Sequence, residues 1–156
     1  MMIRAALYSA TVTALFAVAT AAVPAPVAAQ TAAAAAPATL TIKFDGAMAP
    51  TGAVMVALFD SEAAHDKGGA PVRGGMAKVA GTTAELVIPG LKPGRYAIKA
   101  YHDINGNGEM DSNPFGMPLE PFAFSNGAKA VGGPPSWADA GFEVAPGAAT
   151  VTISFR

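Results

Sequence analysis

Residues 91–111 read LKPGRYAIKAYHDINGNGEMD and join a tight turn, a strand and a polar loop in direct succession. In Lys92-Pro93-Gly94 the proline fixes φ and the glycine allows a positive φ, which favours a reversal of the chain. Residues 95–102 then have the period of 2 that is typical of a strand buried on one face. Because His102 shares its face with Ile98, we expect its ring to lie inward, next to the loop.

The same period and the same kind of turn recur on both sides of this stretch. In residues 39–45, Leu40, Ile42 and Phe44 alternate with polar side chains. Further strands are predicted over residues 53–59, 84–88, 141–144 and 150–155, with proline-glycine turns at 50–52, 89–90 and 146–147. No later stretch forms a convincing amphipathic helix, so the sequence predicts an all-β fold: a single antiparallel β-sandwich, Ig-like or prealbumin-like, of about seven strands. One long excursion, from residue 103 to about 140, carries the polar loop.

The N-terminal residues predict export. Residues 1–29 have the features of a signal peptide: Arg4, an apolar run over residues 5–23, and the small residues Val27-Ala28-Ala29 before a cleavage site. A retained membrane anchor is the alternative, but no basic cluster follows the apolar run, so no stable anchor is expected after cleavage. Residues 30–38 are a low-complexity tether and residues 39–156 the β-sandwich domain. The expected location is periplasmic or secreted.

Composition excludes several classes of function. The chain has no cysteine, which removes disulfides, thiolate metal sites and thiol nucleophiles. Its formal net charge is -1, without a basic cluster, so no nucleic-acid partner is expected. The partner is instead predicted to be an unknown envelope or extracellular ligand.

The polar loop matches the first nine positions of an EF-hand calcium loop, DxNxNGxxD. Its oxygen donors recur at alternate positions and can converge on one ion: the side chains of Asp103, Asn105, Asn107 and Asp111, and the backbone carbonyl of Glu109. Gly108 permits the sharp turn that this requires. Hard oxygen ligands without His or Cys favour Ca2+ over Zn2+.

The loop departs from the EF-hand where the bidentate glutamate should stand, because Pro114 occupies that position. A more distant acid must then complete the site. Glu120 is the first candidate, since the intervening FGMP can fold the chain back, and Asp139 is the second. The alternative interpretation is that the Asn and Gly residues only make consecutive turns.

Three segments resemble a known family: LKPGRYAIKAYHDINGNGEMD (91–111), NPFGMPLEPFAFSNGA (113–128) and PPSWADAGFEV (135–144). They are similar to the bacterial family of uncharacterised exported proteins known as DUF2141. The resemblance implies an exported β-domain and no particular substrate. The turn, strand and DxNxNG also resemble, more loosely, the prealbumin-like B-type repeats of bacterial adhesins, which are calcium-associated spacers.

The leading functional hypothesis is a non-enzymatic, calcium-binding domain with a binding or structural role in the cell envelope. One alternative is a small transthyretin-like hydrolase or isomerase that uses His102 beside the metal loop. The other is a calcium-dependent carbohydrate-binding module that uses the aromatic residues of the excursion, above all Trp137. We expect those aromatic side chains mostly to pin the loop to the sandwich. His65 lies in a polar segment and is expected to be solvated.

Overall fold

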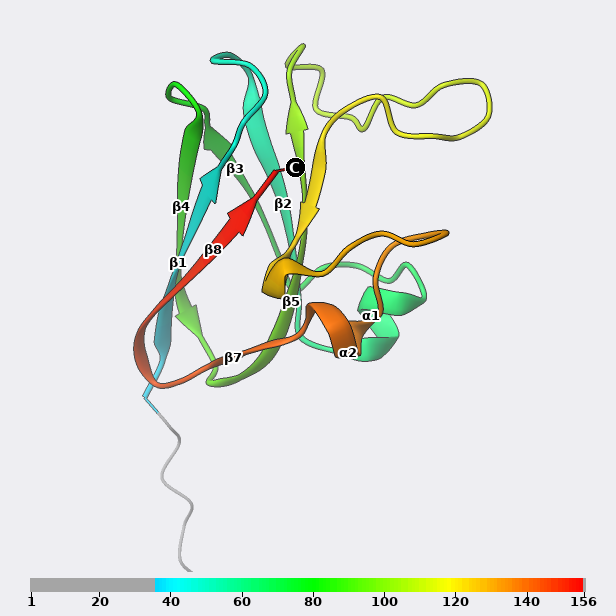
Figure 1. The fold of residues 1–156 in the computed structure, drawn as a ribbon. Helices are drawn as coiled ribbons and strands as arrows, with labels where there is room; N and C mark the ends of the chain where they lie inside the picture. Colours follow the sequence, from blue (N-terminus) through cyan, green and yellow to red (C-terminus); the bar gives the residue numbers. More distant parts are fainter. Residues whose placement is uncertain (1–35, 156) are drawn as a thin grey trace, which may run out of the picture. The chain divides into compact units, whose positions relative to one another are not determined.

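The computed structural model describes residues 36–155, so the predicted signal peptide lies outside the described residues. Two β-sheets pack face to face, which confirms the predicted all-β sandwich (Figure 1). The three-stranded sheet has the order β4 (Thr83–Leu91), β1 (Ala38–Asp45), β8 (Gly147–Ser154). The five-stranded sheet has the order β3 (Arg73–Lys78), β2 (Ala53–Phe59), β5 (Gly94–Asp103), β6 (Phe122–Phe124), and β7 (Phe142–Val144) pairs with the other end of β5.

The core lies between the sheets and follows from the alternation in the sequence. Leu40, Ile42 and Phe44 of β1 are buried, as are the inward residues of β2 and β5 such as Leu58 and Ile98. Each strand therefore contributes every second side chain to the core. β1 begins at Ala38, one residue before the predicted domain boundary, and this residue is also buried.

One strand pairing differs from the predicted antiparallel arrangement. β1 pairs antiparallel with β4 but parallel with β8, from Ala38 opposite Gly147 to Asp45 opposite Ser154. Alternation of apolar side chains is the same for either direction, so the sequence carries no signal for this choice.

The turn predicted at Pro89-Gly90 is wrong. These residues lie within β4, where the register shifts between Leu40 opposite Ile88 and Ala38 opposite Leu91. Gly90 has a φ of 73°, and the two residues form a bulge that keeps the strand paired to Leu91. The turn at 50–52 falls between strands, and the turns at 92–94 and 146–147 end on the first residue of the next strand, Gly94 of β5 and Gly147 of β8.

Strand β3 has no counterpart among the predicted strands, because Gly74 and Gly75 lower its β-propensity. The glycine at position 75 allows close packing: a Cβ there would lie 2.5 Å from Cδ2 of Leu86 on the facing sheet, so the leucine side chain would have to move. The glycines of β3 thus have low β-propensity, but the small size of Gly75 lets the two sheets pack closely.

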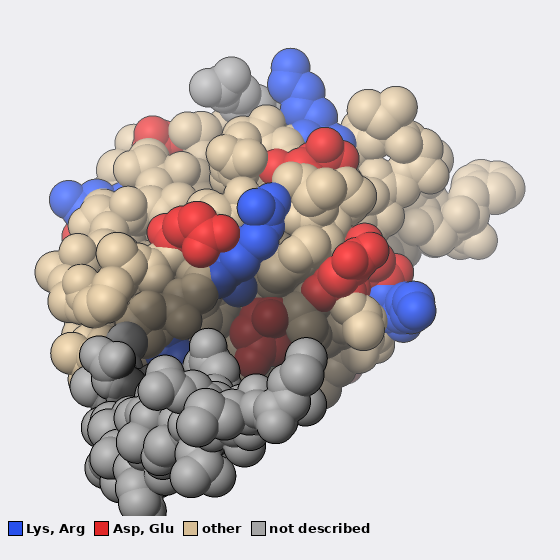
Figure 2. Space-filling model, turned by 90° about the horizontal axis from the view of Figure 1, so that it is seen from below, with Lys and Arg blue, Asp and Glu red and all other residues tan. Residues whose placement is uncertain are grey.

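The long excursion contains short elements that fasten it to the sandwich. After β6 come a 3₁₀ turn, η1 (Ser125–Gly127), and the one-turn helix α2 (Trp137–Ala140), which contacts α1 (Glu62–Asp66) (Figure 1). Among residues 36–155, no helix has the length and apolar character needed to cross a membrane. On the face drawn in Figure 2, acidic and basic side chains are interspersed among uncharged ones.

Candidate functional site

The polar loop begins where β5 ends, and Asp103 organises it. Asp103 is only 3% exposed, and its carboxylate accepts hydrogen bonds from three backbone N–H groups. Oδ1 accepts from Gly106 at 2.7 Å and from Asn107 at 3.2 Å, and Oδ2 accepts from Gly108 at 2.8 Å. Positive φ angles of 77° at Gly106 and 80° at Gly108 let the backbone curl around this carboxylate.

The two asparagines and Asp111 converge on one point of the loop. Nδ2 of Asn105 donates to one oxygen of Asp111 at 2.6 Å, and Nδ2 of Asn107 donates to the other at 3.0 Å. The side-chain oxygens of the asparagines accept backbone N–H groups two residues onward, from Asn107 and Glu109. These are Asx turns, so the turn geometry of the alternative interpretation is present, and the amide nitrogens of the two asparagines, not their oxygens, point at Asp111.

Glu120 lies against the loop, while its predicted role as a metal ligand stays a prediction. Its Oε1 accepts from the backbone N–H of Ile104 at 3.0 Å, and its Oε2 accepts from that of Asp111 at 3.4 Å. Its carboxylate is therefore buried against both ends of the loop. Asp139, the second candidate, lies on α2 instead, where its side chain accepts from the hydroxyl of Ser136 at 2.6 Å.

The segment that carries the loop is acidic. Residues 100–128 contain four acidic residues and no lysine or arginine. Burial raises the pKa of the nearby Tyr101 hydroxyl, and the negative charges of Asp103, Glu120 and Glu109 raise it further. The side chain of Glu109 itself points into solvent, consistent with a role for its carbonyl alone. Within residues 36–155, no group of three or more His, Cys, Asp or Glu side chains is arranged to hold a metal ion.

The ring of His102 points inward, as predicted, and within residues 36–155 it forms no hydrogen bond with a side chain of the loop. Its ring is fully buried in the core, 6.1 Å from the ring of Phe155, and its Nε2–H donates to the carbonyl of Thr51 at 2.8 Å. Nδ1 has no partner among the described residues. Because Asp103 follows on the opposite face of β5, the ring cannot reach a molecule bound at the loop surface.

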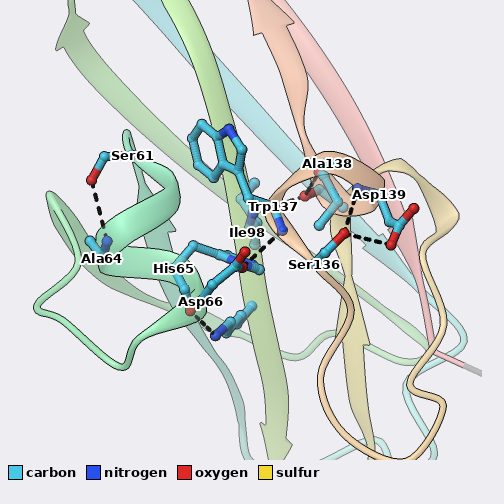
Figure 3. A network of polar contacts seen from close by, with 12 residues as sticks. Ser61, Ala64, His65, Asp66, Ile98, Ser136, Trp137, Ala138 and Asp139 are labelled. Carbon is cyan, nitrogen blue, oxygen red and sulfur yellow. Dashed lines mark hydrogen bonds and ion pairs between the residues drawn. The ribbon is translucent and has the colours of Figure 1, made fainter.

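His65 is also buried, and the prediction that it is solvated is wrong. Nδ1–H of His65 donates to Oδ1 of Asp66 at 2.6 Å, and the same oxygen accepts from the backbone N–H of Trp137 at 2.9 Å (Figure 3). The ring contacts Phe59 and Trp137 edge-on. This network joins α1 to α2, two segments far apart in the sequence.

The aromatic residues of the excursion divide into two groups. Phe124 is buried, and Phe142 and Trp137 are half-buried in contacts with the domain, as expected for residues that pin a loop. Phe115 is 89% exposed and contradicts that expectation. Because Trp137 lies with His65 and α1, it is not beside the polar loop, which begins at the far end of β5.

Ser125 is a structural residue that sequence reasoning did not find. Its hydroxyl is fully buried, accepts from the N–H of Ile98 at 2.8 Å and donates to the carbonyl of Ala140 at 2.6 Å. The Ser125 hydroxyl thereby satisfies the backbone N–H of Ile98, at the edge of β5 just beyond the residues that pair with β6. The only signal is its place in FSNGA, where Asn126 has a φ of 59°, a conformation that asparagine tolerates well.

The comparisons with known proteins identify the family. The family model described as "Uncharacterized protein conserved in bacteria (DUF2141)" matches residues 42–152, from β1 to β8. No curated protein and no solved structure matches the chain. The match covers most of the chain and includes the loop, Glu120 and Ser125, so this protein belongs to the DUF2141 family.

Proposed function

We propose that this protein is an exported, non-enzymatic binding domain of the cell envelope, periplasmic or secreted, whose loop 103–111 and Glu120 take up Ca2+. The observation that supports this most is the position of Glu120. Its carboxylate returns to both ends of a loop that already carries three other acids and no basic residue. A cation would neutralise this cluster.

The donor set suits Ca2+ on chemical grounds. Asp103 accepts three N–H groups and Glu120 two, while a carboxylate offers about four lone-pair positions, so each retains capacity for an ion. The proposal requires the amides of Asn105 and Asn107 to turn their oxygens, in place of nitrogens, toward Asp111. The carbonyl of Glu109 would supply a further ligand.

The role of the ion would be to stabilise the domain. An ion that binds only the folded state adds about 2.7 kcal/mol to the free energy of unfolding when its concentration is a hundred times its Kd. A small domain without cysteine benefits from such a ligand.

Thermal unfolding of the purified protein in chelator and in Ca2+ tests the proposal. Calcium at about 10 mM, above the Kd of typical extracellular modules, should raise the Tm, and Mg2+ should not reproduce the effect. Asp103→Asn and Asp111→Asn keep side-chain shape but remove one charge each, and should abolish the rise. Glu109→Gln is the matched control and should keep it, because only its backbone carbonyl is assigned to the ion. An identical Tm in chelator and calcium would exclude the ion.

The two alternatives have less support. The hydrolase or isomerase hypothesis depends on His102, whose ring lies in the core. The carbohydrate hypothesis depends on Trp137 and calcium acting together, yet Trp137 packs against His65.

Export is tested separately. The mass of the protein recovered from the periplasm or medium should correspond to a chain that starts near Gln30. Recovery of the intact chain in the membrane fraction would instead favour the retained anchor.

A further inference from the structure

The outer face of the five-stranded sheet carries an apolar groove of about 950 Å³. Its floor includes a cross-strand row in which Met76 opposes Met55, Met55 opposes Tyr101, and Tyr101 opposes Phe122. These side chains alternate with those of the core, so they point away from the facing sheet. The volume lies in the range of sites that enclose a small organic ligand.

The walls of the groove come from the two irregular parts of the excursion. Residues 110–118 contribute Met110 and Pro118, and residues 130–134 contribute Ala130 and Pro134. Tyr101 fixes the first wall, because its hydroxyl donates to the carbonyl of Gly108 at 2.9 Å. The calcium loop thus borders the groove without being part of its floor.

Glycine 74 keeps the floor open. A Cβ built at this position has no neighbour closer than 3.8 Å, the carbonyl oxygen of Val56. Gly74 therefore meets no steric demand from the fold, unlike Gly75, and a side chain added here would occupy the groove itself.

Lys99 is the single charged residue that lines the groove. Its ammonium donates to the carbonyl of His65 at 2.6 Å and lies 5.2 Å from the centre of the Phe59 ring. Among the described residues it forms no ion pair. One of its three N–H donors is engaged, which leaves two for a ligand. Burial lowers the pKa of Lys99, and the negative charge of Asp66 opposes this shift without forming an ion pair with the ammonium.

We propose that this groove binds one free long-chain fatty acid, with the acyl chain on the apolar floor and the carboxylate paired with Lys99. Charge complementarity selects an anionic head group, and the apolar floor selects an acyl chain over a sugar, which needs several hydrogen-bonding partners. Lys99 lines the groove and is half-buried, with its ammonium beside His65 and Phe59, so a single extracted molecule can reach it more readily than the flat surface of a bilayer.

Fluorescence titration of the purified protein with a polyene fatty acid, displaced by palmitate, tests the proposal. Palmitate should bind, and its uncharged methyl ester should bind about tenfold or more weakly. Lys99→Met keeps the aliphatic part of the side chain. It should lower the affinity for palmitate to that for the methyl ester and leave the affinity for the ester unchanged. Gly74→Phe should abolish both. Val87→Phe, which adds the same ring to an exposed position of the other sheet, should change neither.

Several results would overturn the proposal. These are no binding of palmitate, equal binding of acid and ester, or affinity for anionic vesicles in place of the monomeric acid. Concentration-dependent dimerisation that Gly74→Phe prevents, without palmitate binding, would identify a second copy as the occupant. If Gly74→Phe fails to fold by circular dichroism, Lys99→Met and the ester still decide. Palmitate is titrated in chelator, because calcium would precipitate it as an insoluble soap. Palmitate binding in chelator, together with a Tm that calcium alone does not change, would uphold the groove and reject the calcium proposal.

Discussion

Oε1 of Glu120 accepts a hydrogen bond from the backbone N–H of Ile104 at 3.0 Å, across 16 positions of the sequence. This contact closes the first half of the excursion into a loop with a defined shape. It also places a buried carboxylate where Asp103 is already buried. Closure of the loop therefore buries two like charges in one segment, and the backbone N–H groups that both carboxylates accept offset the cost of burying them.

Replacement of Glu120 by alanine should open the loop even without calcium. The variant loses acceptors for the N–H groups of Ile104 and Asp111, and we expect the free energy of unfolding in chelator to fall by about 2 kcal/mol. Urea unfolding measures this. Glu109→Ala, at an exposed position of the same loop, should change it by less than about 0.5 kcal/mol. Equal effects of the two variants would mean that the Glu120 contacts add no stability.

Much of the fold follows from the sequence because alternation of apolar residues specifies which face of a strand is buried. This is why the core positions Leu40, Ile42 and Ile98 are predictable. The position of Glu120 beside the loop could be anticipated because the intervening FGMP can fold the chain back, while its role as a metal ligand stays a prediction. The buried state of His65 is not, because it depends on Phe59 and on Trp137, which lies far along the chain.

The groove did leave a signal in the sequence. β2 reads AVMVALF, an apolar run with no polar residue on either face. Such a run is typical of a strand that is covered on both faces. A strand with one face toward water would instead alternate apolar and polar residues. The parallel pairing of β8 leaves no comparable signal, because register and direction depend on contacts between distant segments.

Gly52→Ala should be among the most damaging substitutions in the domain. Gly52 has a φ of 81°, and a Cβ there would lie 2.1 Å from the carbonyl oxygen of Asp103. We expect a loss of about 3 kcal/mol or more, because strain in the left-handed region adds to a clash with the backbone of β5. Gly68→Ala is the matched control, since Gly68 has a φ of 71° and open space around it. Its cost should be about 1 kcal/mol by thermal unfolding. Similar losses for both variants would contradict the clash.

Ser125→Ala should destabilise the edge of β5 without affecting calcium binding. The substitution leaves the N–H of Ile98 and the carbonyl of Ala140 unpaired in the interior, at a cost of about 2 to 4 kcal/mol. Urea unfolding gives the cost, and hydrogen exchange at Ile98 should accelerate. The exposed residue Ser112 provides the control, because Ser112→Ala removes a hydroxyl from solvent. Unchanged exchange at Ile98 would show that its N–H has another acceptor.

Asp66→Asn should lower the melting temperature near neutral pH, because it removes the carboxylate charge that links α1 to α2. The hydrogen bond from His65 holds the pKa of the Asp66 carboxyl below its ordinary value of 3.8. Because the folded-state pKa is the lower one, the charge stabilises the domain above pH 3.8, and this stabilisation is lost as the pH falls through the folded-state pKa. Wild type should therefore melt at a higher temperature than Asp66→Asn near neutral pH, and the two curves should meet in strongly acidic solution. Asp60→Asn, outside this network, controls for the loss of one surface carboxylate. If the melting temperatures of wild type and Asp66→Asn still differ in strongly acidic solution, the effect comes from the changed side-chain packing and not from the lost charge.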